Sequence, residues 1–155
     1  MNKQQVAPPT EPLPESGEAW LNLEQLSHIR LTSEDPLRTI EAALVDYSPG
    51  GWRAAQPGPQ TLWIHFIDPQ KISLISLGFE ATESRTQEFL LSYSRDKGTT
   101  YHELVRQQFN FSARTTREDE NYASTLDGIT DLRLDLVPDV SHGGAYATLK
   151  YLRVR

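Results

Sequence analysis

Trp52 and Arg53, which follow the glycine pair Gly50-Gly51, are side chains suited to holding a polyhydroxylated ligand. A flat indole ring can cover the C–H face of a sugar, and a guanidinium can donate several hydrogen bonds to its hydroxyl groups. The same tryptophan could instead cap the open end of a hydrophobic core, in which case its ring would be buried. Trp52 and Arg53 are therefore candidate ligand-binding residues, with both roles left open for the ring.

Two rows of polar residues extend this candidate site. Arg85 and Gln87 alternate along one segment, and Arg106, Gln108 and Asn110 alternate along another. The members of each row share one face if both segments are strands. Their guanidinium and amide groups could bind a ligand, although polar rows are equally typical of the solvent-facing side of a sheet.

The run Arg114–Glu120, with the sequence RTTREDE, mixes two arginines with three acidic residues directly after an apolar segment. Such a run either contacts a ligand or partner, or forms a solvated loop whose charges pair with one another. The sequence favours the second interpretation without excluding the first.

The sequence contains no pattern of catalytic residues. Its four histidines lack the H-x-H and H-E-x-x-H spacings of zinc sites, and there is no G-x-S-x-G elbow, phosphate-binding glycine loop or dinucleotide fingerprint. Adjacent carboxylates such as Asp119 and Glu120 are too common in loops to indicate acid–base chemistry. Because the chain has no cysteine, disulfides, zinc–thiolate sites and thiol catalysis are excluded. We predict a protein that is not an enzyme and has no catalytic residue, metal or other cofactor.

Length and composition predict one globular domain. A chain of 155 residues suits a single core, and a formal net charge of −6 argues against general nucleic-acid binding. No run approaches the roughly 18 apolar residues of a membrane span, and the start lacks the features of a signal peptide, so we expect a cytoplasmic protein. Residues 1–18 contain four prolines and almost no large apolar side chains, which predicts a disordered tail before a domain at residues 19–155.

Apolar residues at every second position dominate the chain from Leu26 onward, as is typical of half-buried strands. The pattern predicts eight strands, at residues 25–33, 61–66, 72–80, 85–95, 100–112, 121–126, 131–139 and 146–154. The one helical candidate is Leu37–Val45, with Asp35-Pro36 as its start. Residues 67–71, 95–100 and 126–130 are turn sequences. We therefore predict an all-β fold, an eight-stranded antiparallel jelly-roll β-sandwich with one short helix between the first two strands.

The alternation also predicts which side chains lie between the two sheets. These inward-facing residues are Leu62, Ile64, Phe66, Phe89, Leu91, Leu132, Leu134 and Leu136.

The connections between strands alternate between the two ends of such a sandwich if successive strands run antiparallel. The three short turns then share one end, and residues 34–60, 81–84, 113–121 and 140–145 share the other. Binding residues tend to lie on loops held by a rigid scaffold. The longer loops, including the charged run, are therefore predicted to form one binding rim.

The order of motifs resembles that of the discoidin, or coagulation-factor C-type, domain of the galactose-binding-like superfamily. The resemblance extends from about Leu26 to Val154 and is carried by Gly51-Trp52, by TLWIHF followed by ISLISLGF, by FLLSYSRDKGTTYHEL and by LRLDLVPD. Tyr101 stands where the family usually has a tryptophan. The family's frequent disulfide cannot form without cysteine, and the last strand, TLKYLRV, lacks the acidic residue often present there.

This resemblance implies a β-sandwich that binds sugars, lipid head groups, collagen or other proteins, so the fold does not choose the ligand. Some relatives hold a structural calcium near the chain ends, for which Asp35, Glu41 and Asp46 could supply oxygens.

Two functional hypotheses follow. The first is a non-catalytic binding module for a carbohydrate or a similar polyhydroxylated ligand at the loop rim. Its ligand-binding residues would be Trp52, Arg53, Arg85, Gln87, Arg106, Gln108 and Asn110. The second is a protein–protein interaction domain, in which the rim or the outer sheet face with Arg85 and Arg106 binds a partner. The oligomeric state is left open.

Overall fold

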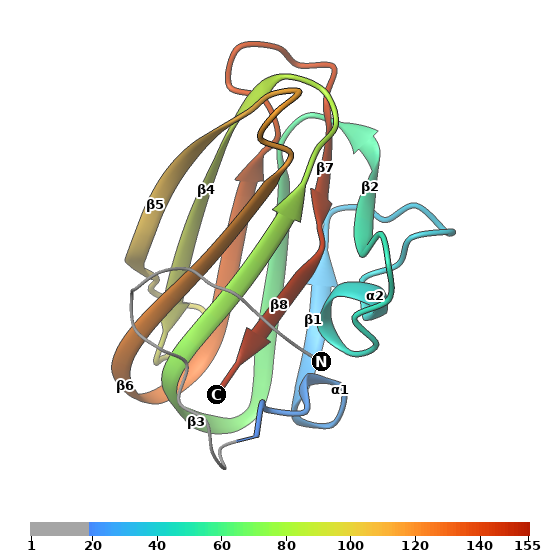
Figure 1. The fold of residues 1–155 in the computed structure, drawn as a ribbon. Coiled ribbons are helices and arrows are strands. Elements are labelled where there is room, and N and C mark those ends of the chain that lie inside the picture. Colours follow the sequence, from blue (N-terminus) through green and yellow to red (C-terminus); the bar gives the residue numbers. More distant parts are fainter. Residues whose placement is uncertain (1–18) are drawn as a thin grey trace.

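A computed structural model of the protein describes residues 19–155, which form an antiparallel β-sandwich (Figure 1). The prediction of a disordered tail at residues 1–18 lies outside the described residues. In chain order the elements are α1 (Leu23–Leu26), β1 (Ser27–Leu31), α2 (Glu41–Leu44), β2 (Trp52–Pro57), β3 (Gln60–Glu80), β4 (Arg85–Ser94), β5 (His102–Phe111), β6 (Arg117–Val137), β7 (Tyr146–Leu149) and β8 (Tyr151–Val154). None of the helices within residues 19–155 is long and apolar enough to cross a membrane.

Two long strands, β3 and β6, connect the layers of the sandwich. The large sheet has the order β1-β3-β6-β4-β5, β8 also pairs with β3, and β2 and β7 form a separate two-stranded sheet. Residues 60–65 of β3 pair with residues 131–136 of β6, and residues 74–80 pair with residues 117–123. Both strands bend together at one end of the sandwich, so a single ribbon contributes to both faces (Figure 1).

Two of the predicted turns are wrong because they lie inside these continuous strands. Residues 67–71 belong to β3 and residues 126–130 to β6, and the ribbon changes direction through register shifts between His65 and Leu74. Gly128, with φ of 68°, provides a left-handed position in the bend of β6. The remaining predicted turn, at residues 95–100, does connect β4 to β5.

The predicted helix is much shorter than its apolar pattern suggested. The Asp35 carboxylate accepts a hydrogen bond from the backbone N–H of Leu37, and Asp35 pairs with Arg38 in a β-bridge. These contacts hold a turn, so the helix α2 begins only at Glu41. The strand β2 and the first helix α1, which is capped by the side chain of Asn22, were not predicted.

The predicted core is confirmed. All eight inward-facing residues have exposed fractions of 8% or less, and Leu134 is 3% exposed. The rings of Phe79 and Phe89 pack together with their centroids 5.3 Å apart. Alternation along the strands was sufficient to find this core, because the pleat directs successive side chains to opposite faces.

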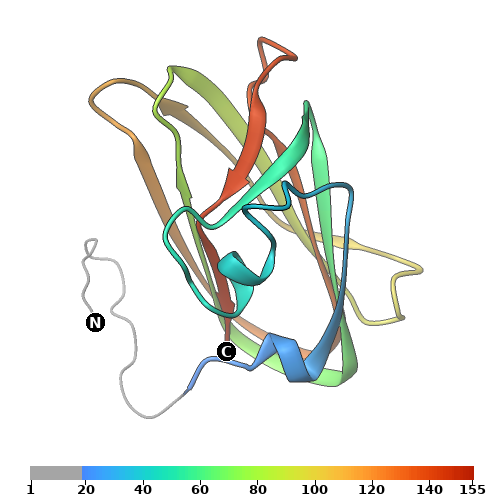
Figure 2. The same cartoon turned by 90° about the vertical axis from the view of Figure 1, so that its right-hand side faces the viewer.

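The predicted division of loops between the two ends is also confirmed. Residues 81–84, 112–116 and 138–145 lie together at one end with the end of β2, and we call this end the loop rim (Figures 1 and 2). The opposite end, with the turn at residues 95–101 and the bends of β3 and β6, is called the bend end. The long segment before β2 departs from the prediction in part, because it forms α2 along the side of the sandwich.

Candidate functional site at the loop rim

Arg85 is a buried cation at the first position of β4, immediately after the loop at residues 81–84. Its side chain is 3% exposed, and its Nη1 donates to Glu83 Oε2 at 3.2 Å and to the backbone oxygen of Tyr146 at 3.1 Å. Burial lowers the pKa of the Arg85 guanidinium, and the charges of Glu83 and Asp139 partly oppose that shift. Three rim segments therefore meet at one guanidinium.

Arg53 lies beside this cation and stacks on the ring of Tyr146. Its Cζ is 4.1 Å from the ring centroid, and its Nη1 is 4.0 Å from Asp35 Oδ2. The two residues come from the neighbouring strands β2 and β7, whose register pairs Arg53 with Thr148. The Arg53 side chain is 36% exposed, so it is the accessible cation of the site.

Asp139 organises the loop between β6 and β7. Its Oδ1 accepts hydrogen bonds from the backbone N–H of Thr86 at 3.4 Å and from the backbone N–H and hydroxyl of Ser141 at 3.1 and 2.9 Å. Although burial raises the pKa of Asp139, these hydrogen bonds lower it below its ordinary value. The carboxylate is therefore ionised at neutral pH and available as an acceptor. A hollow of about 340 Å³, lined by residues 58–59 and 137–143, adjoins it.

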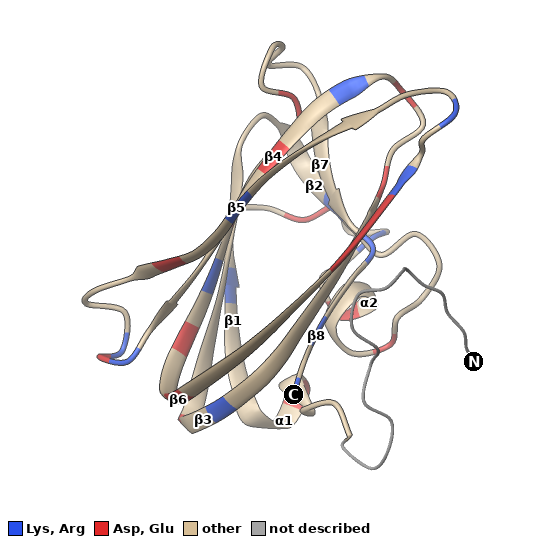
Figure 3. Cartoon of the chain, turned by 60° about the vertical axis from the view of Figure 1, so that its left-hand side comes forward, with Lys and Arg blue, Asp and Glu red and all other residues tan. Residues whose placement is uncertain are grey.

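We define the rim cluster as Arg53, Glu83, Arg85, Asp139 and Tyr146. It combines two guanidinium donors, two carboxylate acceptors and one aromatic ring from β2, β4, β7 and two loops. Basic and acidic segments are interspersed around this end of the molecule in Figure 3. Fork-like donors, fixed acceptors and an apolar ring are the groups that recognise the hydroxyls and C–H faces of a sugar.

Of the two roles left open for Trp52, the ligand-binding one is wrong, because its ring is buried. Its exposed fraction is 5%, and its Nε1 donates to the backbone oxygen of Ser33 at 3.1 Å. Along β2, Trp52 and Ala54 face the core while Arg53 between them faces outward. The alternative of a core-capping tryptophan is the one the structure bears out.

The predicted polar rows lie on opposite sides of the sheet and do not form one surface. Arg85 is paired with Phe111 and Gln87 with Phe109, and residues paired in this way share a face. Gln87 is 1% exposed and its Nε2 donates to Glu118 Oε1 at 3.2 Å, so it lies inside the sandwich.

The second row faces the outer side of β4 and β5. Arg106 and Gln108 donate to the two oxygens of Glu88, each at 2.9 Å, and Asn110 accepts from the hydroxyl of Thr86 at 2.7 Å. These three residues are exposed on the outer face of the sheet, whereas Arg85 points toward the inner face. The hypothesis of one partner-binding face containing both Arg85 and Arg106 is therefore wrong.

The charged run at residues 114–120 is largely paired within the protein. Arg117 opens β6 and binds Asp119 at 2.8 Å and Glu80 at 3.4 Å, and Asp119 accepts from the hydroxyl of Tyr151 at 2.7 Å. Glu118 is buried, with an exposed fraction of 2%. The part of the run from residue 117 is thus an ordered strand and not a loop.

Sequence reasoning missed Glu83, Asp139 and Tyr146 as site residues. The signal that could have found two of them was loop position, because residues 81–84 were already assigned to the rim and Tyr146 directly follows the loop at residues 140–145. Asp139 was assigned to the end of a strand. Asp139 ends the motif LRLDLVPD, which pointed to a fold and not to a ligand, and only the folded chain brings the three residues to the arginines.

Within residues 19–155, no group of three or more His, Asp or Glu side chains is placed to hold a metal ion. Asp35, Glu41 and Asp46, which could have supplied oxygens to a structural calcium as in some relatives of the family that the sequence resembles, do not form such a group. The Asp35 carboxylate instead holds the turn before α2.

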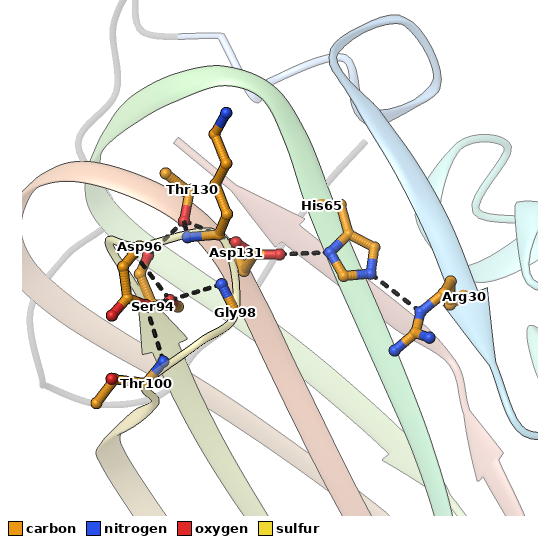
Figure 4. A network of polar contacts seen from close by, with 9 residues as sticks. Arg30, His65, Ser94, Asp96, Gly98, Thr100, Thr130 and Asp131 are labelled. Carbon is orange, nitrogen blue, oxygen red and sulfur yellow. Dashed lines mark hydrogen bonds and ion pairs between the residues drawn. The ribbon is translucent and has the colours of Figure 1, made fainter.

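A second polar network occupies the bend end (Figure 4). Arg30 Nε donates to His65 Nε2 at 3.1 Å, and His65 Nδ1 contacts Asp131 Oδ2. The hydroxyl of Thr130 donates to Asp131 Oδ1 at 2.6 Å and accepts from the backbone N–H of Lys97 at 2.8 Å. Both ring nitrogens of His65 have partners, so the network fastens strands and the β4–β5 turn together and leaves no free base.

Neither a protein-family model nor a curated protein matches the sequence. Solved structures do match. The family 32 carbohydrate-binding module of Clostridium perfringens NanJ, solved with galactose, aligns with a TM-score of 0.63 at 13% identity, covering 87% of this chain and 96% of that one. A pectin-binding carbohydrate-binding module aligns at 0.61 and 17% identity, covering 84% and 91%.

The family 32 module of AlyQ, solved with 4,5-unsaturated mannuronic acid, aligns with a TM-score of 0.59 at 15% identity, covering 84% of this chain and 95% of that one. These likenesses show that the chain has the discoidin-like, galactose-binding-like fold that the sequence motifs resemble.

Proposed function

We propose that the protein is a non-catalytic carbohydrate-binding module whose ligand site is the rim cluster. The observation that carries this proposal is the Arg53 guanidinium stacked on Tyr146 beside Arg85, Glu83 and Asp139 at the loop end of the sandwich. The solved modules with the same fold include one with galactose bound and one with a uronic acid derivative, which supports a sugar as the ligand class.

Each group of the rim cluster has a role in this proposal. The Arg53 guanidinium donates hydrogen bonds to sugar hydroxyls, and Asp139, held ionised by Ser141 and Thr86, accepts them. The Tyr146 ring contributes an apolar surface against C–H groups. Binding by hydrogen bonds and ring contact involves no bond cleavage, so no general acid or nucleophile is needed.

A glycan array probed with the full chain, with competition by free sugar, tests this proposal. We expect Arg53→Gln and Tyr146→Ala each to weaken binding, and the loss of charge-assisted hydrogen bonds at Arg53 to cost about 1.5–3 kcal/mol. Arg106→Gln is the matched control, because Arg106 is an exposed arginine whose carboxylate partners, Glu88 and Glu103, lie on the outer face. Circular dichroism of each variant must show an unchanged fold.

Two results would contradict the proposal. One is an array with no binding above background. The other is binding that Arg53→Gln and Arg106→Gln reduce equally, which would indicate a general charge effect. Binding of a protein at the rim without competition by any sugar would support the protein-interaction alternative.

A further inference from the structure

Arg85 uses only part of its hydrogen-bonding capacity. Nη1 has two partners, whereas Nε is buried without any. Nη2 has no partner among residues 19–155 and is not among the enclosed atoms, so it reaches solvent. Nη1 and Nη2 form one end of the guanidinium, the fork that binds both oxygens of a carboxylate. One arm of this fork is free, and Glu83 contacts the other.

A second positive charge makes this fork more favourable for an anion. Arg85 is 3% exposed at its side chain, and burial lowers its pKa, with the charge of Arg53 acting in the same direction. Two guanidiniums close enough to disfavour each other's charge are stabilised by a carboxylate placed between them.

Glu83 is a weakly held occupant of the Arg85 fork. Its side chain is 62% exposed and lies on the short loop between β3 and β4, and one of its oxygens contacts Nη1 at 3.2 Å. Because the Arg85 guanidinium is buried, Glu83 can leave it at small cost only when another carboxylate takes its place. Its departure leaves Nη1 and Nη2 together available to another carboxylate.

We propose that the rim cluster selects sugars that carry a carboxylate, and that the ligand carboxylate replaces Glu83 on the Arg85 fork. This inference rests on the proposed function and makes it specific to the uronic acid class. Arg53 contributes the second cation. Glu83 competes with the ligand carboxylate for the Arg85 guanidinium, and this competition sets the affinity for the acidic sugar. Neutral sugars then bind through the hydroxyl contacts alone.

The test is titration calorimetry of the full chain with trimers of galacturonate, mannuronate and glucuronate, each compared with its methyl ester. The ester has the same rings and hydroxyls without the charge. For at least one trimer we expect the acid to bind about tenfold tighter than its ester, as charge-assisted hydrogen bonds provide. That difference should shrink as sodium chloride is raised.

Glu83→Gln is the decisive variant, because it removes the competing charge and keeps the side-chain shape. It should tighten binding of the acid about two- to fivefold relative to binding of the ester. Glu103→Gln is the matched control, since Glu103 is 55% exposed and contacts Arg106 at 3.7 Å on the outer face. This substitution should change the binding of neither the acid nor the ester. Replacement of the buried Arg85 risks unfolding, so Arg53→Gln tests the cation side and should reduce the preference for the acid.

The outcomes separate this inference from the proposed function. Equal binding of acid and ester, with both weakened by Arg53→Gln, would overturn the acid preference while the carbohydrate site stands. No effect or a loss of acid binding in Glu83→Gln, or an equal gain in Glu103→Gln, would overturn the displacement of Glu83. If no trimer and no ester binds and the glycan array shows no binding, both the acid preference and the proposed carbohydrate-binding function are overturned.

Discussion

At the bend end of the sandwich the buried polar groups bond to one another, whereas near the loop rim several lack partners. Asp131, 2% exposed, contacts Thr130 through one oxygen and His65 through the other. Arg85 Nε, Gln87 Oε1 and Glu118 Oε2 are buried near the rim without a hydrogen bond. An unpaired buried polar group costs free energy, so these two ends contribute differently to stability.

This difference separates scaffold from site. The Asp131 network joins β1, β3, β6 and the β4–β5 turn, and it holds the bent ribbon on which the rim is built. The rim also presents the exposed charged side chains of Arg53 and Glu83, as a surface that exchanges partners requires. We therefore expect substitutions at the bend end to change stability, and substitutions of exposed rim residues to change binding.

The core between the two ends provides the reference for stability. Leu134→Ala should lower the free energy of unfolding by about 2–5 kcal/mol, because a 3% exposed leucine leaves a cavity when truncated. Urea unfolding measures this change. Ile67→Ala, at a 57% exposed position of β3, should stay within about 0.5 kcal/mol. A loss below that value for Leu134→Ala would mean that its face is wrongly assigned.

At the bend end, Asp131→Asn should cost about 1–3 kcal/mol of unfolding free energy. The amide can accept from Thr130 with its oxygen, but its NH₂ group then meets the N–H of His65, and a buried donor is left unpaired. Chemical denaturation gives the value, with the exposed Asp127→Asn as control. An unchanged midpoint would show that the network does not hold the ribbon.

Near the rim, Glu118→Gln should stabilise the protein at alkaline pH. Burial and the neighbouring Glu120 raise the pKa of the Glu118 carboxyl to about 9, from an ordinary value of 4.5. A raised pKa means that the folded state binds the Glu118 proton more tightly than the unfolded state does. The contribution of this proton to the free energy of unfolding is therefore complete below about pH 4.5, and it is lost as the pH rises through about 9.

The free energy of unfolding of the native protein should therefore fall between pH 5 and pH 8 relative to Glu118→Gln, by about 1–2 kcal/mol because Glu120 shares the proton. Parallel pH profiles for the two proteins, measured by urea unfolding, would contradict this prediction. They would place the Glu118 carboxyl in a solvated environment.

The smallest stability effect is expected for Arg53→Gln, at about 0.5 kcal/mol or less. Its ion pair with Asp35 is long, at 4.0 Å, and the side chain is 36% exposed. Thermal melts should coincide with those of the native protein while sugar binding is weakened. A large fall in melting temperature would instead make Arg53 part of the scaffold.

The sequence alone determined the core and the arrangement of the loops, because both depend on local geometry. The pleat sends alternate residues to opposite faces, so Leu62, Phe89 and Leu134 could be placed inside from their spacing alone. Antiparallel succession placed the longer connections at one end. Among the candidate site residues, Arg53 and Arg85 were correctly placed near that end.

Tertiary structure decided which face of each polar row is buried and how the rim is completed. Alternation says that Arg85 and Gln87 share a face, but only their pairing with Phe111 and Phe109 directs that face inward. The buried position of Trp52 includes a hydrogen bond to the backbone oxygen of Ser33, which is distant in the sequence. Arg53 contacts Tyr146 only because β2 pairs with β7. These contacts join segments far apart in the chain, and no local pattern of residue types encodes them.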